Sequence, residues 1–250
     1  MAWFNIPPGS ILQHFYLKER IKKIPTICRR FLDIGCGNGY VSRIFLEEGW
    51  EGVGIDLNEE ACKFNYAFNQ KYISSKRYTI INDDFLKVNL PYDKYDVIVS
   101  YMVIEHLDNE ELANFIKKSM NLLYNKGTLI FQVPANMKFW GIEDDIAGHV
   151  KRYEMNDIIN LSSEHNLKIN HIAGLNYPIS NWLLSLSNIL IKRQEKDKLT
   201  LSQKEKTIYS GKRDVLLKTK FPRIFALILN PFFLYPFHLL QKFFSISVNR

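Results

Sequence analysis

The feature that most constrains the fold is a glycine-rich turn, Asp33-Ile34-Gly35-Cys36-Gly37-Asn38-Gly39, which joins an apolar run to a helical pattern. Residues 31–34 predict a short buried strand, and residues 40–48 predict a helix. Glycines lack a Cβ, so the end of the strand can approach a ligand closely, and the helix N-terminus offers unpaired N–H groups to a carboxylate. The turn therefore predicts a nucleotide-like ligand at the carboxyl end of this strand.

Short apolar runs alternate with longer helical patterns along the chain. This alternation is typical of strand-helix-strand units, and it predicts an α/β fold with a doubly wound, mostly parallel sheet. Ligands of such sheets lie at the carboxyl ends of the strands. We predict strands over residues 31–34, 52–57, 78–81, 95–100, 127–133 and, as a sixth, about 167–172. We predict helices over residues 40–48, 59–71, 109–124 and 156–164.

Two flanking regions complete the predicted organisation. Residues 1–29 predict a cap helix with Ser10 as its N-cap and an end near Pro25. Residues 30–175 form the sheet unit, and residues 176–250 form an apolar and basic helical extension.

The charge distribution and the cysteines indicate which kinds of protein the chain does not resemble. Residues 192–223 contain 11 Lys/Arg against 4 Asp/Glu, an excess equal to the net charge of +7, so the other residues together sum to zero and the sheet unit is not basic. Cys28, Cys36 and Cys62 show neither metal-ligand spacing nor the even number of a secreted disulfide scaffold. The first residues lack the layout of a signal peptide. We therefore expect a cytoplasmic protein.

A second motif strengthens the prediction of a ligand. Asp56 ends the second predicted strand, 17 residues after Gly39, where its carboxylate could accept both hydroxyls of a ribose. The turn has the spacing Gly-x-Gly-x-Gly, unlike the Gly-x-Gly-x-x-Gly of a dinucleotide-binding turn, which disfavours NAD. With Asp83-Asp84-Phe85 and residues 95–107, these motifs resemble the class I S-adenosylmethionine-dependent methyltransferases. The resemblance spans roughly residues 31–175.

The resemblance implies S-adenosylmethionine as cofactor and a position for each of its parts. The methionine portion would meet the glycine turn, the ribose the end of the second strand, and the adenine the end of the third. The sulfonium methyl would lie beside the end of the fourth strand. The residues implied are, in that order, Asp33, Gly35 and Gly37; Asp56 and Leu57; Asp84 and the backbone of Phe85; Ser100 and Tyr101.

Methyl transfer from a sulfonium mainly needs an aligned acceptor, and it needs a base where the acceptor is a hydroxyl of high pKa. We predict Glu105, His106 and His149 as catalytic, with either histidine as the base. Arg152 and Tyr153 follow His149 and predict a substrate-binding clamp. The alternative for each histidine and for this loop is a purely structural role.

The same residues could supply mixed oxygen and nitrogen ligands to a metal. Quinone-biosynthesis and small-RNA 3′-end methyltransferases carry Glu-x-x-Glu-His at this point and bind a divalent cation. Met102 stands at the first Glu position here, so the ligand set is incomplete and we predict no metal.

The extension contains a strongly apolar stretch, residues 224–240, which Pro231 and Pro236 interrupt. It has 17 residues, whereas a spanning helix needs roughly 20. Beside the basic segment it predicts an interfacial anchor on an anionic membrane surface, and a lid or a dimer face is the equal alternative. The last antiparallel strand of the fold is hard to find, and residues 246–248 are a poor candidate.

The leading hypothesis is O-methylation of a small-molecule, glycan or lipid-linked hydroxyl, in the cytoplasm or peripherally at the inner face of the membrane. The loop from Gly148 to Tyr153, followed by an apolar tail, resembles bacterial enzymes linked to cell-surface glycan or lipid pathways. Two alternatives stay open. One is an RNA methyltransferase, which the basic segment suggests although no RNA-binding module is recognisable. The other is a non-catalytic, membrane-associated scaffold.

Overall fold

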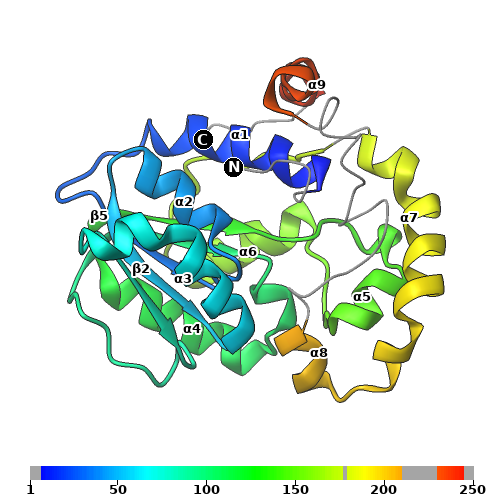
Figure 1. Ribbon diagram of the computed structural model, residues 1–250, viewed down its shortest axis with the longest axis horizontal. Coiled ribbons are helices and arrows are strands. Elements are labelled where there is room, and N and C mark those ends of the chain that lie inside the picture. The colour runs from blue at the N-terminus through cyan, green and yellow to red at the C-terminus, as the bar shows by residue number, and fades with distance from the viewer. Residues whose placement is uncertain (1–6, 177–178, 210–229, 245–250) are drawn as a thin grey trace.

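A computed structural model describes residues 7–176, 179–209 and 230–244 of the chain. Its centre is a 5-stranded sheet in the order β3-β2-β1-β4-β5, in which every pair of neighbouring strands is parallel. The order reverses between β1 and β4, and such a point is where open α/β sheets bind ligands. This confirms the predicted doubly wound fold (Figure 1). The strands are β1 Arg30–Ile34, β2 Glu51–Asp56, β3 Tyr78–Asn82, β4 Tyr95–Tyr101 and β5 Leu123–Gln132.

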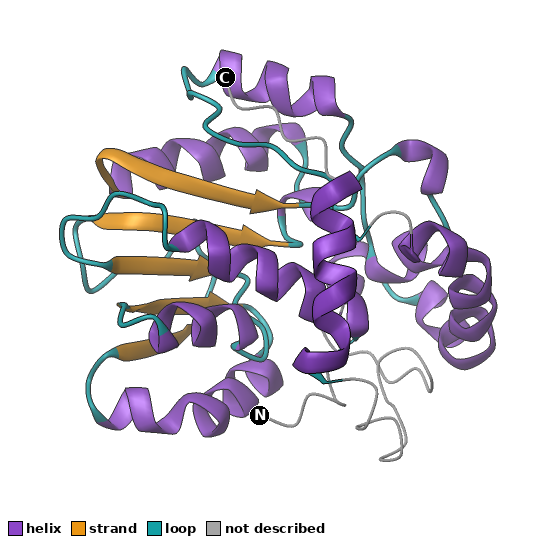
Figure 2. Ribbon diagram, turned by 90° about the horizontal axis from the view of Figure 1, so that it is seen from above, coloured by secondary structure: helices purple, strands orange, loops and turns teal. Residues whose placement is uncertain are grey.

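Helices cover both faces of the sheet because the strands are apolar on both sides (Figures 1 and 2). In β4, Val97 and Val99 join the core under α1, α2 and α3, whereas Ile98 joins the core under α4 and α6. Side chains of a strand alternate between its faces, so one strand supplies both cores. The covering helices are α1 Pro8–Ile21, α2 Tyr40–Glu47, α3 Glu59–Ser74, α4 Asn109–Leu122 and α6 Met155–Glu164.

The remaining elements form a second group beyond the carboxyl edge of the sheet and above α1 (Figure 1). Helices α7 and α8 pack against α5, and α9 packs against α1. No helix among the described residues is long and apolar enough to cross a membrane. The elements are η2 Ile104–His106, η3 Met137–Phe139, α5 Ile142–Ala147, α7 Ile179–Glu195, η4 Lys196–Thr200, α8 Gln203–Tyr209 and α9 Pro231–Phe244.

The predicted sixth strand is wrong. Residues 167–172 form no strand, and β5 is an edge of the sheet. The segment packs beside α1 instead, where the His171 ring nitrogen shares a hydrogen bond of 2.6 Å with the Tyr16 hydroxyl. Residues 246–248 lie outside the described residues.

Two predicted boundaries are also wrong. The first helix begins at Pro8, so Ser10 lies inside it and Pro7 is the N-cap. Proline suits the first turn because its φ is already helical and its missing N–H has no helical partner there. The fifth strand begins at Leu123, directly after α4, because Leu123 already pairs with Tyr95 of β4.

Candidate active site

The glycine turn lies at the carboxyl end of β1, next to the point where the strand order reverses. Gly37 has φ +48°, and a Cβ built on it would meet no atom within 4 Å, so its backbone faces open space. Gly39 has φ +78°, and a Cβ there would lie 2.1 Å from the Asn65 Oδ1. The turn therefore fits a ligand on one side and packs tightly against α3 on the other.

Asp56, at the end of β2, is joined to this turn. Its Oδ2 accepts a hydrogen bond from the Gly37 N–H (2.7 Å), and its Oδ1 accepts one from the Asn58 N–H (2.8 Å). Burial raises the pKa of Asp56, while these two N–H groups act in the opposite direction. Each carboxylate oxygen has a second lone pair, so both can still accept from a ribose. The next residue, Leu57, has a half-exposed side chain.

Asp33 is fully buried behind the turn. Its Oδ2 accepts a hydrogen bond of 2.6 Å from Ser42, which in turn accepts one from the Tyr78 hydroxyl (2.7 Å). Its Oδ1 has no hydrogen-bond partner among the described residues. Burial raises the pKa of Asp33 to about 7, and the neighbouring Asp56 adds to the shift. Its contact with the methionine portion stays a prediction, and its carboxyl lies directly before the turn in the chain.

This environment makes cofactor affinity dependent on pH. Between about pH 6 and about pH 8 Asp33 passes from neutral to ionised, and the anion favours a cationic ligand, so affinity for S-adenosylmethionine should rise roughly tenfold. Calorimetric titration at several pH values measures this rise. Asp33→Asn is the matched control, because the ligand's own amino group titrates equally with both proteins. An equal pH profile for the two proteins would contradict the assignment.

The predicted adenine position lies after β3. The Asp84 Oδ1 accepts from the Leu86 N–H (2.9 Å), and its Oδ2 lies 3.1 Å from the Lys87 Nζ. The Phe85 ring is buried, with its centroid 5.1 Å from that of Phe115. Its carbonyl oxygen accepts from the Lys118 Nζ (2.6 Å). The turn is thus rigidly built, and its contact with adenine stays a prediction.

Ser100 and Tyr101 end β4, beside Ile34 and the start of the glycine turn. Ser100 is buried, and its Oγ has no partner among the described residues. The Tyr101 hydroxyl donates to Gln13 of α1. Burial raises the Tyr101 pKa far above its ordinary value, so the phenol stays protonated. Their place near the sulfonium methyl stays a prediction.

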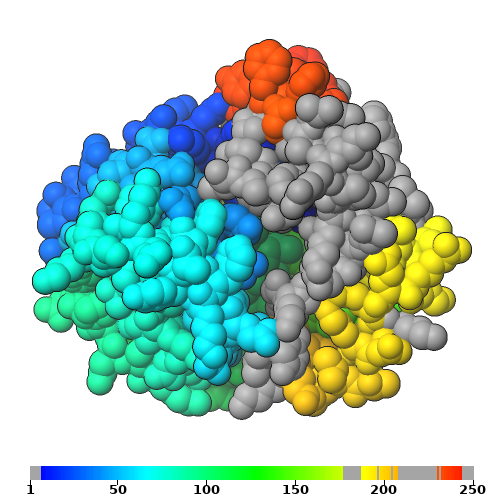
Figure 3. Space-filling view, in the orientation of Figure 1, coloured from blue at the N-terminus to red at the C-terminus, as the bar shows by residue number. Residues whose placement is uncertain are grey.

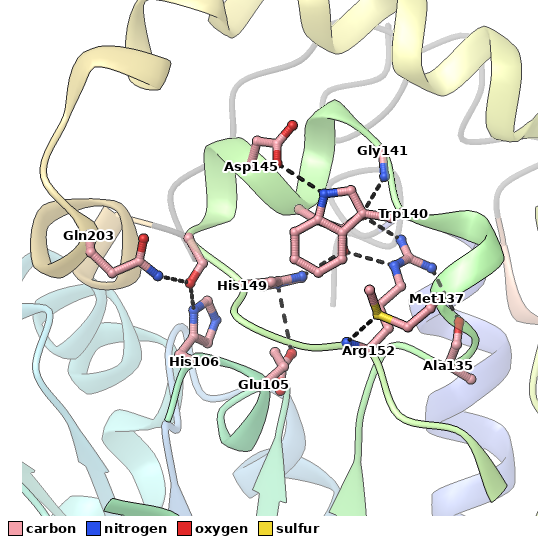
Figure 4. Close-up of polar contacts among 12 residues, drawn as sticks. Glu105, His106, Ala135, Met137, Trp140, Gly141, Asp145, His149, Arg152 and Gln203 are labelled. Carbon is pink, nitrogen blue, oxygen red and sulfur yellow. Dashed lines mark hydrogen bonds and ion pairs between the residues drawn. The ribbon is translucent and has the colours of Figure 1, made fainter. Parts of the chain in front are cut away.

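The three predicted catalytic side chains lie together just beyond β4 (Figure 4). The rings of His106 and His149 meet edge to face with centroids 4.8 Å apart. The His149 Nε2 lies 3.9 Å from the Glu105 Oε1. The His106 Nδ1 donates to the Gly148 carbonyl (3.1 Å), which also accepts from the Gln203 Nε2 (2.5 Å). The sequence prediction that these residues converge on one place thus agrees with the geometry.

Asp144, which sequence reasoning missed, organises this cluster. Its Oδ1 lies 2.7 Å from the His149 Nδ1, and its two oxygens accept from the Arg152 Nε (2.9 Å) and the Arg152 Nη2 (3.0 Å). Burial alone raises the pKa of Asp144, but the hydrogen bonds from His149 and Arg152 outweigh it and lower the pKa to about 2. An ionised Asp144 accepts the Nδ1 proton of His149, which leaves Nε2 as the basic nitrogen.

Glu105 is completely buried, and neither carboxylate oxygen has a hydrogen-bond partner among the described residues. Burial raises its pKa to about 8, and the nearby Asp144 contributes. Glu105 is therefore mostly protonated at neutral pH. A neutral carboxyl beside His149 offers a hydrogen-bond donor without a competing charge.

Arg152 and Tyr153 hold the loop in place. The Arg152 guanidinium is occupied by Asp144 and donates to the Ala135 carbonyl (3.3 Å). The Tyr153 ring is buried, and its hydroxyl donates to the Ile104 carbonyl (3.1 Å). Both side chains therefore have partners within the protein. Their contact with substrate stays a prediction.

One ligand atom from each of Glu105, His106 and His149 lies within 4.8 Å of the others. One carboxylate and two imidazoles are a ligand set that catalytic metal sites use with open positions. The sequence prediction of no metal relied on Met102, and it is neither confirmed nor contradicted by this cluster. The cluster makes chelation an essential control in any assay.

Sequence reasoning also missed the polar support of the glycine turn. Asn69 donates to the Gly39 carbonyl (3.2 Å) and to Asn65 (2.8 Å), and Asn65 donates to Tyr78 (3.1 Å). The available signal was two asparagines four residues apart in a helix that should otherwise present apolar side chains to the sheet.

The chain matches the family described as a methyltransferase domain over residues 11–172. A similar protein is the ubiquinone biosynthesis O-methyltransferase of Pelagibacter ubique, 26% identical over 68% of this chain and 73% of the relative. Sphingolipid C9-methyltransferase 2 of Gibberella zeae is 25% identical over 49% of this chain, which spans only 25% of that relative.

Among solved structures, magnesium protoporphyrin IX methyltransferase from Synechocystis PCC 6803 with bound SAH has a similar fold. Its TM-score is 0.54 at 18% identity, covering 66% of this chain and 76% of that one. The family match covers most of the sheet unit, and relatives named as S-adenosylmethionine-dependent enzymes agree with the glycine turn and Asp56. The chain belongs to the class I methyltransferases, enzymes that use S-adenosylmethionine as their cofactor.

Proposed function

We propose that the chain methylates a hydroxyl group of a small-molecule, glycan or lipid-linked acceptor, with His149 as the general base. The observation that carries the proposal is the hydrogen bond between the His149 Nδ1 and the Asp144 Oδ1, which lie 2.7 Å apart. A buried carboxylate that fixes one nitrogen of an imidazole leaves the other nitrogen to accept a proton, and this is the arrangement of a base that takes a proton from a hydroxyl. Arg152 positions Asp144 through two hydrogen bonds.

The roles of the side chains follow from their protonation. S-adenosylmethionine supplies the methyl carbon to which the acceptor oxygen bonds while the sulfur keeps the electron pair of the broken bond. The His149 Nε2 receives the hydroxyl proton. Glu105, protonated because burial raises its pKa to about 8, can donate a hydrogen bond that orients the acceptor oxygen. His106, fixed through its Nδ1 to the Gly148 carbonyl, forms the adjoining wall.

The named relatives support an oxygen or lipid acceptor. One relative is named a ubiquinone biosynthesis O-methyltransferase, which agrees with an oxygen acceptor. Another is named a sphingolipid C9-methyltransferase, which agrees with a lipid acceptor and not with methylation of oxygen. The RNA alternative remains a prediction from the basic segment, and RNA binding that weakens steeply with salt would be its signature.

The test is transfer of a labelled methyl group from S-adenosylmethionine to a panel of acceptors, with lipid-linked sugars and polyprenylated phenols first. We expect label on a hydroxyl oxygen, at an unchanged rate after treatment with EDTA, because the proposed base needs no metal. Loss of turnover on chelation, with recovery on adding a divalent cation, would replace the base by a metal site on Glu105, His106 and His149. Label on nitrogen or carbon alone would contradict O-methylation.

A further inference from the structure

Helix α9 has an inverted distribution of polarity. Its inward positions are Leu234, His238 and Gln241, at the spacing of one helix face, and the last two are polar yet 0% and 2% exposed. Its outward side chains are almost all apolar and are 45% to 83% exposed. They are Phe232, Phe233, Tyr235, Phe237, Leu239 and Phe243. A helix packed on a soluble core normally has the opposite distribution.

Polar bonds on the inner side hold α9 in this orientation. The His238 Nε2 lies 2.9 Å from the Glu19 Oε1, and the Lys242 Nζ lies 2.7 Å from the Glu19 Oε2. The Gln241 Nε2 donates to the Leu12 carbonyl (2.9 Å). Rotating the helix to bury its aromatic side would break all three interactions and leave Glu19 without these partners. The outward aromatic side is therefore a built feature of the pairing between α1 and α9.

The apolar side chains of α9 and the charge of the neighbouring sequence indicate what binds this surface. An exposed apolar ridge of this kind marks an interaction site (Figure 3, where α9 lies at the top edge of the view). Helix α9 contains no Asp or Glu, and its flanks, residues 210–230 and 245–250, contain six Lys/Arg against one Asp. Exposed aromatic side chains on a helix without acidic residues, in a part of the sequence that is basic, match the interface of an anionic bilayer, with its apolar depth and negative headgroups.

We propose that α9 is an interfacial membrane anchor that lies on an anionic bilayer, with its aromatic side inserted among the headgroups. The helix has 14 residues, so it lies in the plane of the interface and does not cross the bilayer. A second copy of this chain fits less well, because two such flanks would bring like charges together.

The anchor lies one helix away from the site. Helix α1 carries α9 on its outer side through Leu12, while the neighbouring Gln13 accepts from Tyr101 at the end of β4. A membrane-bound protein would therefore hold the carboxyl edge of its sheet near the bilayer, where a lipid-linked acceptor is found. This link to the acceptor rests on the proposed function, whereas the membrane contact itself does not.

The test is flotation of the full chain with vesicles, without cofactor or acceptor. One vesicle contains phosphatidylcholine and phosphatidylglycerol, and the other contains phosphatidylcholine alone. We expect binding to the anionic vesicle only, and we expect the double variant F232S/F243S to weaken it roughly tenfold or more. Both side chains are 83% exposed, so their removal leaves the packing on α1 intact. The matched control is I27S/Y66S, which removes side chains 69% and 54% exposed outside α9.

Binding that the control variant retains and F232S/F243S loses supports the anchor. No binding to the anionic vesicle, or equal binding to both vesicles, overturns it. Sedimentation of the same samples adds a further outcome. A dimer that F232S/F243S dissociates, without vesicle binding, would show that the ridge joins two copies of the chain and would also overturn the proposal. None of these outcomes depends on methyl transfer, so the anchor and the enzymatic function can fail separately.

Discussion

Asp56→Ala is expected to weaken binding of S-adenosylmethionine by roughly 100-fold or more, because a hydrogen bond to a charged group contributes about 1.5–3 kcal/mol and both ribose bonds would be lost. The loss has a second cause in this structure. The Asp56 carboxylate also accepts a hydrogen bond from the Gly37 N–H, so the variant removes this support of the glycine turn, where we expect the ligand to bind. Calorimetric titration with S-adenosylmethionine and its demethylated product measures the effect.

Asp93→Ala is the matched control for this variant. Asp93 is an exposed carboxylate just before β4, at the edge of the sheet opposite the glycine turn. It should bind the cofactor like the unaltered protein. Circular dichroism must show that Asp56→Ala is folded. A folded Asp56→Ala with unchanged affinity would remove Asp56 from the ribose site.

His149→Ala is expected to lower turnover by roughly 100-fold or more while cofactor affinity stays the same, because loss of a general base affects the proton transfer and leaves the glycine turn intact. The measurement is the rate of methyl transfer at saturating cofactor, alongside calorimetric titration. A near-normal rate would exclude His149 as the base.

Two further variants separate the base from its surroundings. Asp144→Asn keeps the shape of the side chain but removes the charge that fixes the His149 Nδ1 proton, so turnover should fall roughly tenfold to 100-fold. His106→Ala should reduce turnover less than His149→Ala, since the His106 Nδ1 is bonded to a backbone carbonyl and not to a carboxylate. The reverse order would assign the base to His106.

The sequence was sufficient to predict the sheet because its signals are local. Each of the first four strands is a short apolar run next to a glycine, an acid or a turn, and the spacing from Gly39 to Asp56 places both at the same edge. The convergence of Glu105 with His149 could also be predicted. Glu105 follows the carboxyl end of β4, His149 lies in the segment after the carboxyl end of β5, and both ends lie at the same edge of the sheet. These inferences needed only periodicity and the rule for parallel strands.

Other features depend on contacts that no local pattern records. Asp144 is one of three acids in Glu143-Asp144-Asp145 of α5, and only the folded structure shows that the middle one is completely buried and bonded to His149 and Arg152. Residues 167–172 begin with an alternating pattern, Leu167 and Ile169, yet they form no strand, and His171 bonds to Tyr16 of α1. In the same way, only the structure shows that the polar side chains of α9 face inward and its aromatic side chains face outward.

The Gly148 carbonyl, which accepts from both His106 and Gln203, connects the C-terminal part of the chain to the proposed catalytic site. Gln203 belongs to α8, well beyond the boundary at residue 175 that the sequence suggested for the catalytic unit. A fragment ending there would retain the glycine turn and Asp56 but lose one of the two donors that fix the backbone under the imidazole pair. If the proposed roles hold, we expect a protein trimmed at that boundary to bind the cofactor but to turn over more slowly.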